Sequence, residues 1–196
     1  MPLWGAVEGS EALPKFLTTA QQKDVFANQS GWVVEAGSAM TGNGNTSADP
    51  EILVAIGGLA GASGTTGLGE ATINTVDWNI TTFDKSAGGT LSVTVRYNET
   101  VTVAVSNPTI IVTNSTNTNH TLTYASGTGT HELTFTLVIG AANAATDAGD
   151  VLSIAAQSIV LASSSTIKDT SDTPADAELA ISSAQGTACG TITVVA

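Results

Sequence analysis

Clustered carboxylates in the C-terminal half are the side chains of this sequence best suited to metal chemistry. Asp147 and Asp150 share one predicted loop, and Asp169 and Asp172 share another. Hard cations need several oxygen ligands, which clustered loop carboxylates can supply. These four residues are therefore Ca²⁺ candidates if both loops fall at one end of the fold. The alternative is two solvated acidic loops. Because no EF-hand pattern is present, we expect no resident metal or cofactor.

The two histidines, His120 and His131, are the next residues to consider. No Cys or His spacing in the chain suits zinc. The two rings are expected near opposite ends of one hairpin, so we interpret them as surface strand residues in preference to paired ligands. Neither a nucleophile-elbow motif nor a paired-carboxylate motif is present. We therefore expect that the protein is not an enzyme.

Strands must position these side chains, because apolar and polar residues alternate through much of the chain. The alternation is clearest in Leu91–Tyr97, Val101–Val105 and Leu133–Leu137. A period of two predicts half-buried antiparallel strands with one face on a core. The predicted inner face carries Leu91, Val93, Val95, Leu122, Tyr124, Leu133, Phe135 and Leu137. The outer face is mostly Thr and Ser.

Strand signals recur from about residue 71 to the C-terminus at a spacing typical of a sandwich. The predicted strands are 72–80, 90–97, 100–106, 109–113, 120–124, 132–139, 151–155, 158–161, 178–181 and 191–195. Tyr97–Thr100 is predicted to be a tight turn, and Ser126–Gly129 a glycine-bearing hairpin loop. No long segment has helical periodicity, so one sheet must pack on another. Residues 71–196 are therefore predicted to form an antiparallel β-sandwich.

Residues 1–70 have a different pattern, with bulky apolar residues scattered among polar ones. Thr19–Gln22 matches a capping box and predicts a short helical segment ending near Ala27. Gly31–Glu35 and Glu51–Ile56 are predicted strands, and Gly57–Gly69 has the composition of a flexible linker. We expect an extended N-terminal docking arm and linker with little regular structure.

The apolar residues of this arm have two possible roles. They could dock on neighbouring subunits, since large aromatic side chains dominate many interfaces. Alternatively, they could complete the core of the main domain. The candidate docking residues are Leu3, Trp4, Phe16, Leu17, Phe26 and Trp32.

The composition excludes several classes of partner. The formal net charge is −12, with five Lys and Arg residues in total. Phosphate binding draws on clustered basic side chains, so we expect no nucleic acid partner, and no anionic membrane surface. The single cysteine, Cys189, permits no intrachain disulfide. The N-terminal residues lack the pattern of an export signal, so we expect assembly in a host cytoplasm.

The stretch from Gly89 to Leu179 resembles the bacterial Ig-like repeats of large surface adhesins. The residues that carry the resemblance are 89–103, 108–112, 124–138, 149–154 and 166–169, in the order found in that family. The Tyr-x-Ser-Gly-x-Gly-Thr hairpin leading into Leu-x-Phe is the most specific element. The resemblance implies an Ig-like sandwich.

The N-terminal part resembles a leader found on virion structural proteins of tailed phages. Met1–Gly5, Pro14–Leu17, Phe26, Gly31–Val33 and Glu51–Ala55 carry this second resemblance. Such leaders often precede a variable Ig-like module. The resemblance implies a protein mounted on a virion, without saying on which part.

Two functional hypotheses follow from these resemblances. In the first, the protein is a capsid decoration or cement protein on the outer capsid surface, whose arm binds the major capsid protein and whose Ig-like domain projects outward. We expect a homo-oligomer, and a homotrimer would suit a symmetry axis. In the alternative, the same sandwich is a tail, neck or fibre adhesin that binds host-surface glycans, with Trp78, Phe83, Tyr97 and Tyr124 as its aromatic candidates.

Overall fold

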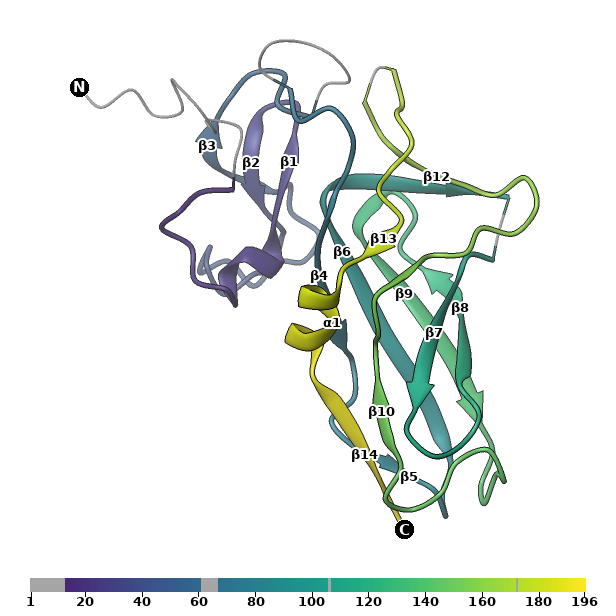
Figure 1. Ribbon diagram of the computed structural model, residues 1–196. Helices are drawn as coiled ribbons and strands as arrows, with labels where there is room; N and C mark the ends of the chain where they lie inside the picture. The colour runs from purple at the N-terminus through teal and green to yellow at the C-terminus, as the bar shows by residue number, and fades with distance from the viewer. Residues whose placement is uncertain (1–12, 61–66, 106, 172) are drawn as a thin grey trace.

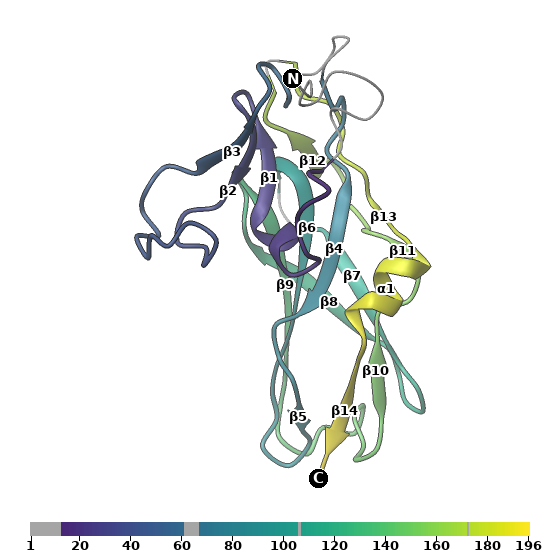
Figure 2. The same cartoon turned by 90° about the vertical axis from the view of Figure 1, so that its left-hand side faces the viewer.

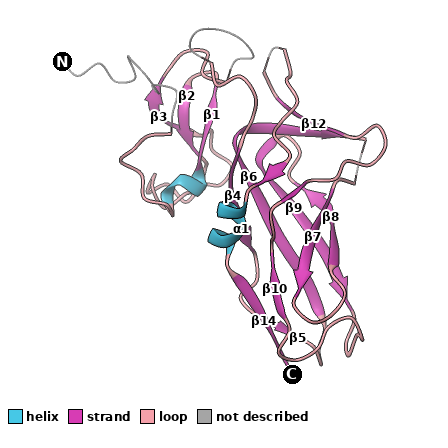
Figure 3. Ribbon diagram, viewed as in Figure 1, coloured by secondary structure: helices cyan, strands magenta, loops and turns pink. Residues whose placement is uncertain are grey.

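A long central strand, β6 (Gly89–Ala104), joins two unequal parts of the molecule (Figure 1). The computed structural model describes residues 13–60, 67–105, 107–171 and 173–196. Strands dominate the regular structure, and α1 (Ser183–Cys189) is the only α-helix among the described residues (Figure 3). The expected all-β class is confirmed.

The larger part is a β-sandwich whose main sheet has the strand order β4-β6-β9-β8-β7. Its strands besides β6 are β4 (Ile73–Trp78), β7 (Thr109–Asn114), β8 (His120–Ser126) and β9 (Thr130–Ile139). All four pairings are antiparallel. In the longest pairing, Val93 lies opposite Phe135 and Val95 opposite Leu133, which aligns the apolar faces of β6 and β9. This alignment follows from the two-residue period of the sequence.

Shorter strands form the second layer. From β7 the sheet path continues through β10 (Val151–Ser153) and β14 (Thr191–Val195) to β5 (Phe83–Asp84), which pairs parallel with β14. Separately, β11 (Gln157–Ser158) pairs with β13 (Ala180–Ile181), and β12 (Thr166–Asp169) pairs with the C-terminal half of β6. The two layers enclose one core, and all eight residues of the predicted inner face belong to it or pack against it.

Residues near the N-terminus form a small sheet of their own, called here the N-terminal sheet. A 3-10 turn, η1 (Gln21–Asp24), leads into β1 (Val25–Asn28), β2 (Gly31–Val34) and β3 (Glu51–Ala55). The three strands form an antiparallel meander, and β1 also pairs with β6 in parallel. Figures 1 and 2 place this sheet at the end of the sandwich opposite the C-terminus.

The N-terminal sheet has more regular structure than the extended arm that we expected. Val25, Ala27, Trp32, Val34 and Leu59 bury one another in a separate apolar cluster. Trp32 is only 2% exposed. One large indole surrounded by aliphatic side chains fills this small core. The scattered apolar residues of the sequence show no period that would predict it.

The predicted helical segment from Thr19 to Ala27 is wrong in its second half. Val25, Phe26 and Ala27 are strand residues of β1. The reciprocal capping hydrogen bonds join Thr18 and Gln21, one residue earlier than predicted. Helical structure ends at Asp24 because the apolar run that follows pairs with β2.

The predicted turn at Tyr97–Thr100 is also wrong, because β6 continues through it. The pairing register between β6 and β9 shifts between Arg96 and Val101. A bulge of this kind lets a strand bend without ending, and it breaks the alternation in the same way as a turn. Its consequence is that Asn98 and Glu99 become buried.

Candidate functional site

The N-terminal sheet meets the sandwich at the bulged part of β6. Ala27 of β1 pairs with Glu99 of β6. Beside this pair, the ring of Phe26 stacks on His131 of β9, with centroids 4.4 Å apart and planes 14° from parallel. His131 was expected at the surface but is 3% exposed, because Phe26 covers it from 105 positions earlier in the chain. We call this region the junction.

Glycine at position 127 allows the β8–β9 hairpin to bring His131 to the junction. Gly127 has a φ of +115°, and a Cβ there would lie 1.8 Å from the backbone oxygen of Glu132. Only glycine tolerates both this φ and this contact. The predicted hairpin at Ser126–Gly129 is confirmed, since β8 pairs with β9 across it.

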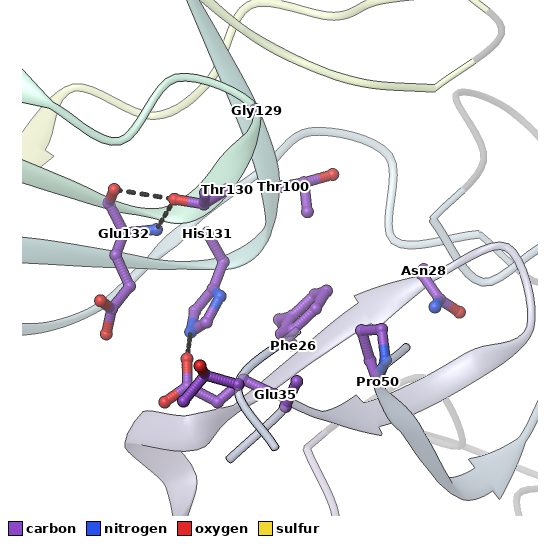
Figure 4. A pocket seen from close by; sticks show the side chains of 11 residues that line it. Phe26, Asn28, Glu35, Pro50, Thr100, Gly129, Thr130, His131 and Glu132 are labelled. Carbon is purple, nitrogen blue, oxygen red and sulfur yellow. Dashed lines mark hydrogen bonds and ion pairs between the residues drawn. The ribbon is translucent and has the colours of Figure 1, made fainter. Parts of the chain in front are cut away.

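A pocket of about 490 Å³ opens at the junction (Figure 4). Phe26, Asn28 and Glu35 line it from the N-terminal sheet side, and Thr100, Thr130 and His131 line it from the sandwich. Its walls are therefore formed jointly by two parts of the chain that are far apart in sequence. Pockets lined by both apolar and polar side chains are the usual places for small ligands.

Three side chains with metal-ligating atoms gather in this pocket. Glu35, His131 and Glu132 each offer one ligand atom, and the three atoms lie within 4.8 Å of one another. Nε2 of His131 is 3.7 Å from Oε2 of Glu35 and 3.3 Å from the backbone oxygen of Lys23. Figure 4 shows the His131 ring directed at the Glu35 carboxylate.

Burial changes the proton affinity of these groups. It raises the pKa of Glu35 to about 7, and the nearby Glu132 and Asp24 carboxylates act in the same direction. Burial also lowers the pKa of His131 below its ordinary value, against the opposite influence of Glu132. His131 is therefore a neutral imidazole at neutral pH, and its ring can accept a metal ion through a nitrogen lone pair.

A chain of ion pairs runs behind the pocket. Nη1 of Arg96 is 2.7 Å from Asp77, and its Nε is 2.5 Å from Oε1 of Glu132. Asp77 also pairs with Lys23 of η1. Arg96, the single arginine of the sequence, thus links the sandwich side of the pocket to an acid that the N-terminal segment also contacts.

A second buried acid, Glu99, lies on the same strand. It is 1% exposed, and none of the described residues donates a hydrogen bond to its Oε1. Burial raises its pKa to about 7, and Asp169 acts in the same direction. The burial of this acid could not be predicted from the sequence, because Glu99 lies inside the stretch predicted to be a turn.

The Ca²⁺ candidates that the structure describes do not form one group: Asp147 and Asp150 share a loop, and Asp169 lies elsewhere. Asp150 precedes β10 at the end of the sandwich that holds the C-terminus, whereas Asp169 ends β12 near the N-terminal sheet (Figure 1). Asp172 lies outside the described residues. Asp147 pairs with Lys85, and Asp169 accepts hydrogen bonds from Ser171 and the backbone of Ala175.

Asp150 in particular is surrounded by donors. Burial acts to raise its pKa, but hydrogen bonds from Thr116, the Asp147 backbone, Asn114 and Asn117 outweigh burial and hold the pKa far below its usual range. These N–H and O–H groups occupy the carboxylate that a cation would need. The Asp150 loop is therefore a hydrogen-bonded structural turn. His120, also predicted at the surface, is buried near it, 3.5 Å from the Thr146 hydroxyl.

The docking candidates have different environments. Leu17, Phe26 and Trp32 are buried by the chain itself, whereas Phe16 is 58% exposed. Leu3 and Trp4 lie outside the described residues. Phe16 lines an apolar hollow of about 330 Å³ together with Leu53, Val54 and Ala55 of β3.

Strand β3 is the outer strand of the N-terminal sheet. It pairs with β2 and, among the described strands, lies at the end of the sheet path. Ile52 on this strand is 56% exposed. An apolar outer strand presents unpaired backbone groups that another strand can join.

The aromatic residues considered for glycan binding are poorly placed for it. Phe83 and Tyr97 are buried, and Trp78 and Tyr124 pack against the core. The Tyr124 hydroxyl accepts a hydrogen bond from the Thr128 backbone. In the described part of the sandwich, none of these four rings forms an exposed platform.

Comparisons of this chain with protein-family models, with curated proteins and with solved structures found no match. Among the described residues, no helix is long and apolar enough to cross a membrane.

Proposed function

We propose that this protein is a structural virion protein of the capsid decoration type, which docks through its N-terminal segment and displays an Ig-like sandwich. The observation that carries the proposal is the exposed apolar edge of the N-terminal sheet. Ile52 and the hollow beside Phe16 lie in the part of the chain that resembles phage virion leaders. That resemblance points to a virion, and on it our proposal takes the major capsid protein as the partner.

Docking at this edge would combine two kinds of interaction. A strand of the capsid subunit would add to β3 through backbone hydrogen bonds, as in β-strand addition. Its apolar side chains would cover Ile52 and enter the hollow lined by Phe16 and Leu53. Repetition over a shell multiplies a modest affinity per site. The mechanism is binding alone, with no catalytic step.

The proposal revises which residues carry the docking. Leu17 and Trp32 belong to the apolar cluster that supports the edge, whereas Phe26 is buried against His131 at the junction. Phe16 and Ile52 would make the contact itself. The acidic sandwich, carrying part of the net charge of −12, would keep the displayed surface soluble.

Binding to purified capsids tests this proposal. Replacing Phe16 and Ile52 together by Glu should weaken sedimentation with capsids by about tenfold or more, because two charges would enter an apolar contact. Val138→Glu is the matched control, since Val138 is 74% exposed but belongs to the sandwich. Equal binding by both variants would contradict docking at β3. Equal binding to capsids and to isolated tails would favour the adhesin alternative.

A further inference from the structure

We propose that Glu35, His131 and Glu132 bind a divalent transition-metal ion of the zinc class, which would cross-link the N-terminal sheet to the sandwich. Glu35 follows β2, whereas His131 and Glu132 belong to β9. Their ligand atoms already lie within 4.8 Å of one another. This inference is independent of the docking proposal, because it needs no capsid.

The separations fit a small ion. Zinc bonds to His nitrogen and carboxylate oxygen are about 2.0–2.2 Å long, so two tetrahedral ligand atoms lie roughly 3.4 Å apart. Nε2 of His131 and Oε2 of Glu35 are 3.7 Å apart. The side chains of Glu35 and Glu132 are each about one-third exposed, so both can adjust to close the remaining distance.

The donor set selects the class of metal. One imidazole and two carboxylates suit Zn²⁺ and its first-row neighbours, whereas Ca²⁺ and Mg²⁺ take oxygen ligands. Among the described residues three protein ligands converge here, so a fourth position would be open to water from the pocket of about 490 Å³. An open fourth position is also the arrangement of zinc sites that exchange ligands.

Neighbouring groups hold His131 in place for this role. The Phe26 ring stacks against the imidazole and fixes its plane. In the metal-free protein, the ring proton sits on Nε2 when that nitrogen donates to the Lys23 carbonyl, 3.3 Å away. Metal binding would place the proton on Nδ1 and turn the Nε2 lone pair to the ion, with no net change in ring charge.

Arg96 does not prevent the ion from binding. It contacts Oε1 of Glu132, and a carboxylate has a second oxygen. Its Nη1 is directed to Asp77, 2.7 Å away, which also pairs with Lys23. The acids around the site, Glu35, Glu132, Asp24 and Asp77, outnumber the two bases Arg96 and Lys23. Glu35, whose pKa is raised to about 7, would release its proton as the ion binds.

Calorimetric titration of the full chain tests the site, with the protein freed of any histidine tag and of metal by chelation. Zn²⁺ should bind with a stoichiometry of one and raise the melting temperature. Co²⁺ should give the visible absorption bands of a four-coordinate site. Glu35→Gln should weaken Zn²⁺ binding by at least about tenfold, since even outer-shell changes cost roughly 10–100-fold in affinity.

Matched controls separate this site from other ligands. Glu51→Gln removes a charge from the same small sheet, and His120→Gln removes the other histidine; both should bind Zn²⁺ like the parent chain. Cys189→Ser should also leave binding unchanged. His131→Gln should abolish the Co²⁺ bands, and circular dichroism would verify its fold. If His131→Gln does not fold, Glu35→Gln still tests the site. Glu35 is partly exposed, so its replacement by Gln should leave the fold intact.

Two results would overturn the assignment. One is the absence of Zn²⁺ and Co²⁺ binding by the parent chain. The other is undiminished binding by Glu35→Gln, which would locate the ion on surface acids elsewhere.

Discussion

At the scale of single residues, Glu99 is the group whose environment has the clearest thermodynamic consequence. The folded chain raises its pKa to about 7, mainly through burial and then through Asp169. An unfolded chain returns a glutamate to its ordinary pKa of about 4.3. At pH values between about 4.3 and 7, Glu99 is therefore protonated in the folded state and ionised in the unfolded state. The stabilisation from neutral Glu99 is complete below the unfolded pKa and is lost as pH rises to about 7.

Glu99→Gln should therefore remove part of the pH dependence of folding. Glutamine keeps the size of the side chain and carries no charge, so the variant should gain stability relative to the parent as pH rises from 5 to 8. The gain should reach a few kcal/mol, at about 1.4 kcal/mol per unit of pKa difference. Urea unfolding of both chains at several pH values measures it.

The same experiment has an internal control. Glu51→Gln removes an exposed carboxylate from β3 and should show the pH profile of the parent. A constant difference between Glu99→Gln and the parent across this pH range would show that Glu99 is charged in both states.

At the scale of elements, Gly31 determines whether β2 and β3 can pair. Its φ is +132°, and a Cβ would lie 2.0 Å from the backbone oxygen of Val54. Gly31→Ala should therefore push β3 away from β2 and destabilise the N-terminal sheet, by about 2 kcal/mol or more from backbone strain and steric clash. Hydrogen exchange of residues 25–34 and 51–55 measures the loss.

Gly44→Ala is the matched control for this change. A Cβ at Gly44 would meet nothing within 4 Å, and Gly44 lies in the loop between the same two strands. This variant should exchange like the parent. Equal behaviour of Gly31→Ala and Gly44→Ala would show that the close approach of β3 is not required for folding.

The elements also show what the sequence could predict. Leu91, Val93, Leu133 and Phe135 alternate with polar residues over long runs, so their shared buried face was predictable. The unbroken path of β6 through Tyr97–Thr100 was not, because a bulge and a turn interrupt the period in the same way. The pairing of β1 with β6 depends on residues more than 70 positions apart, which no local pattern encodes.

Helix α1 was predictable from a local signal. Ser182 and Gln185 form a capping box of the same kind that we sought at Thr19. With seven residues, the helix is too short to show a helical period in the sequence. Gly186 lets the helix pack closely against the backbone at Ile154, because a Cβ at position 186 would lie 2.2 Å from the Ile154 backbone oxygen.

The candidate site was harder to anticipate than the fold. Glu35, His131 and Glu132 have no metal-ligand spacing in the sequence, since nearly 100 positions separate Glu35 from the other two. The adjacent pair His131-Glu132 was visible, but nothing local indicated that Phe26 would bury the imidazole. Burial by a distant segment is a tertiary effect, and it changed the interpretation of both histidines.

At the scale of the whole molecule, the two apolar clusters depend on the junction to behave as one unit. The cluster of the N-terminal sheet draws on residues 13–68, and that of the sandwich on residues 71–194. Between them run the Phe26–His131 stack, the β1–β6 pairing and the ion pairs of Asp77. A small sheet with few apolar residues gains little stability alone, so these contacts should determine how often it opens.

Asp77→Asn should uncouple the two parts. Asp77 pairs with Lys23 of η1 and with Arg96 of β6, and its side chain is 20% exposed. Neutral Asn would keep the shape but lose both charge interactions, at a cost of about 1–2 kcal/mol for partly screened pairs. Hydrogen exchange of residues 25–34 should accelerate by roughly 5–30-fold, while residues 89–97 should change less.

Lys168→Met provides the comparison for this last prediction. It breaks the ion pair with Asp176, 2.7 Å long and largely exposed, on an element outside the junction. Exchange in residues 25–34 should then match the parent, because a solvent-screened pair contributes little and both of its residues belong to the sandwich. If Asp77→Asn and Lys168→Met accelerate exchange in residues 25–34 equally, general charge loss is responsible. If neither changes it, the apolar stack and strand pairing alone hold the two parts together, and the ion pairs serve only to satisfy the charges around the pocket.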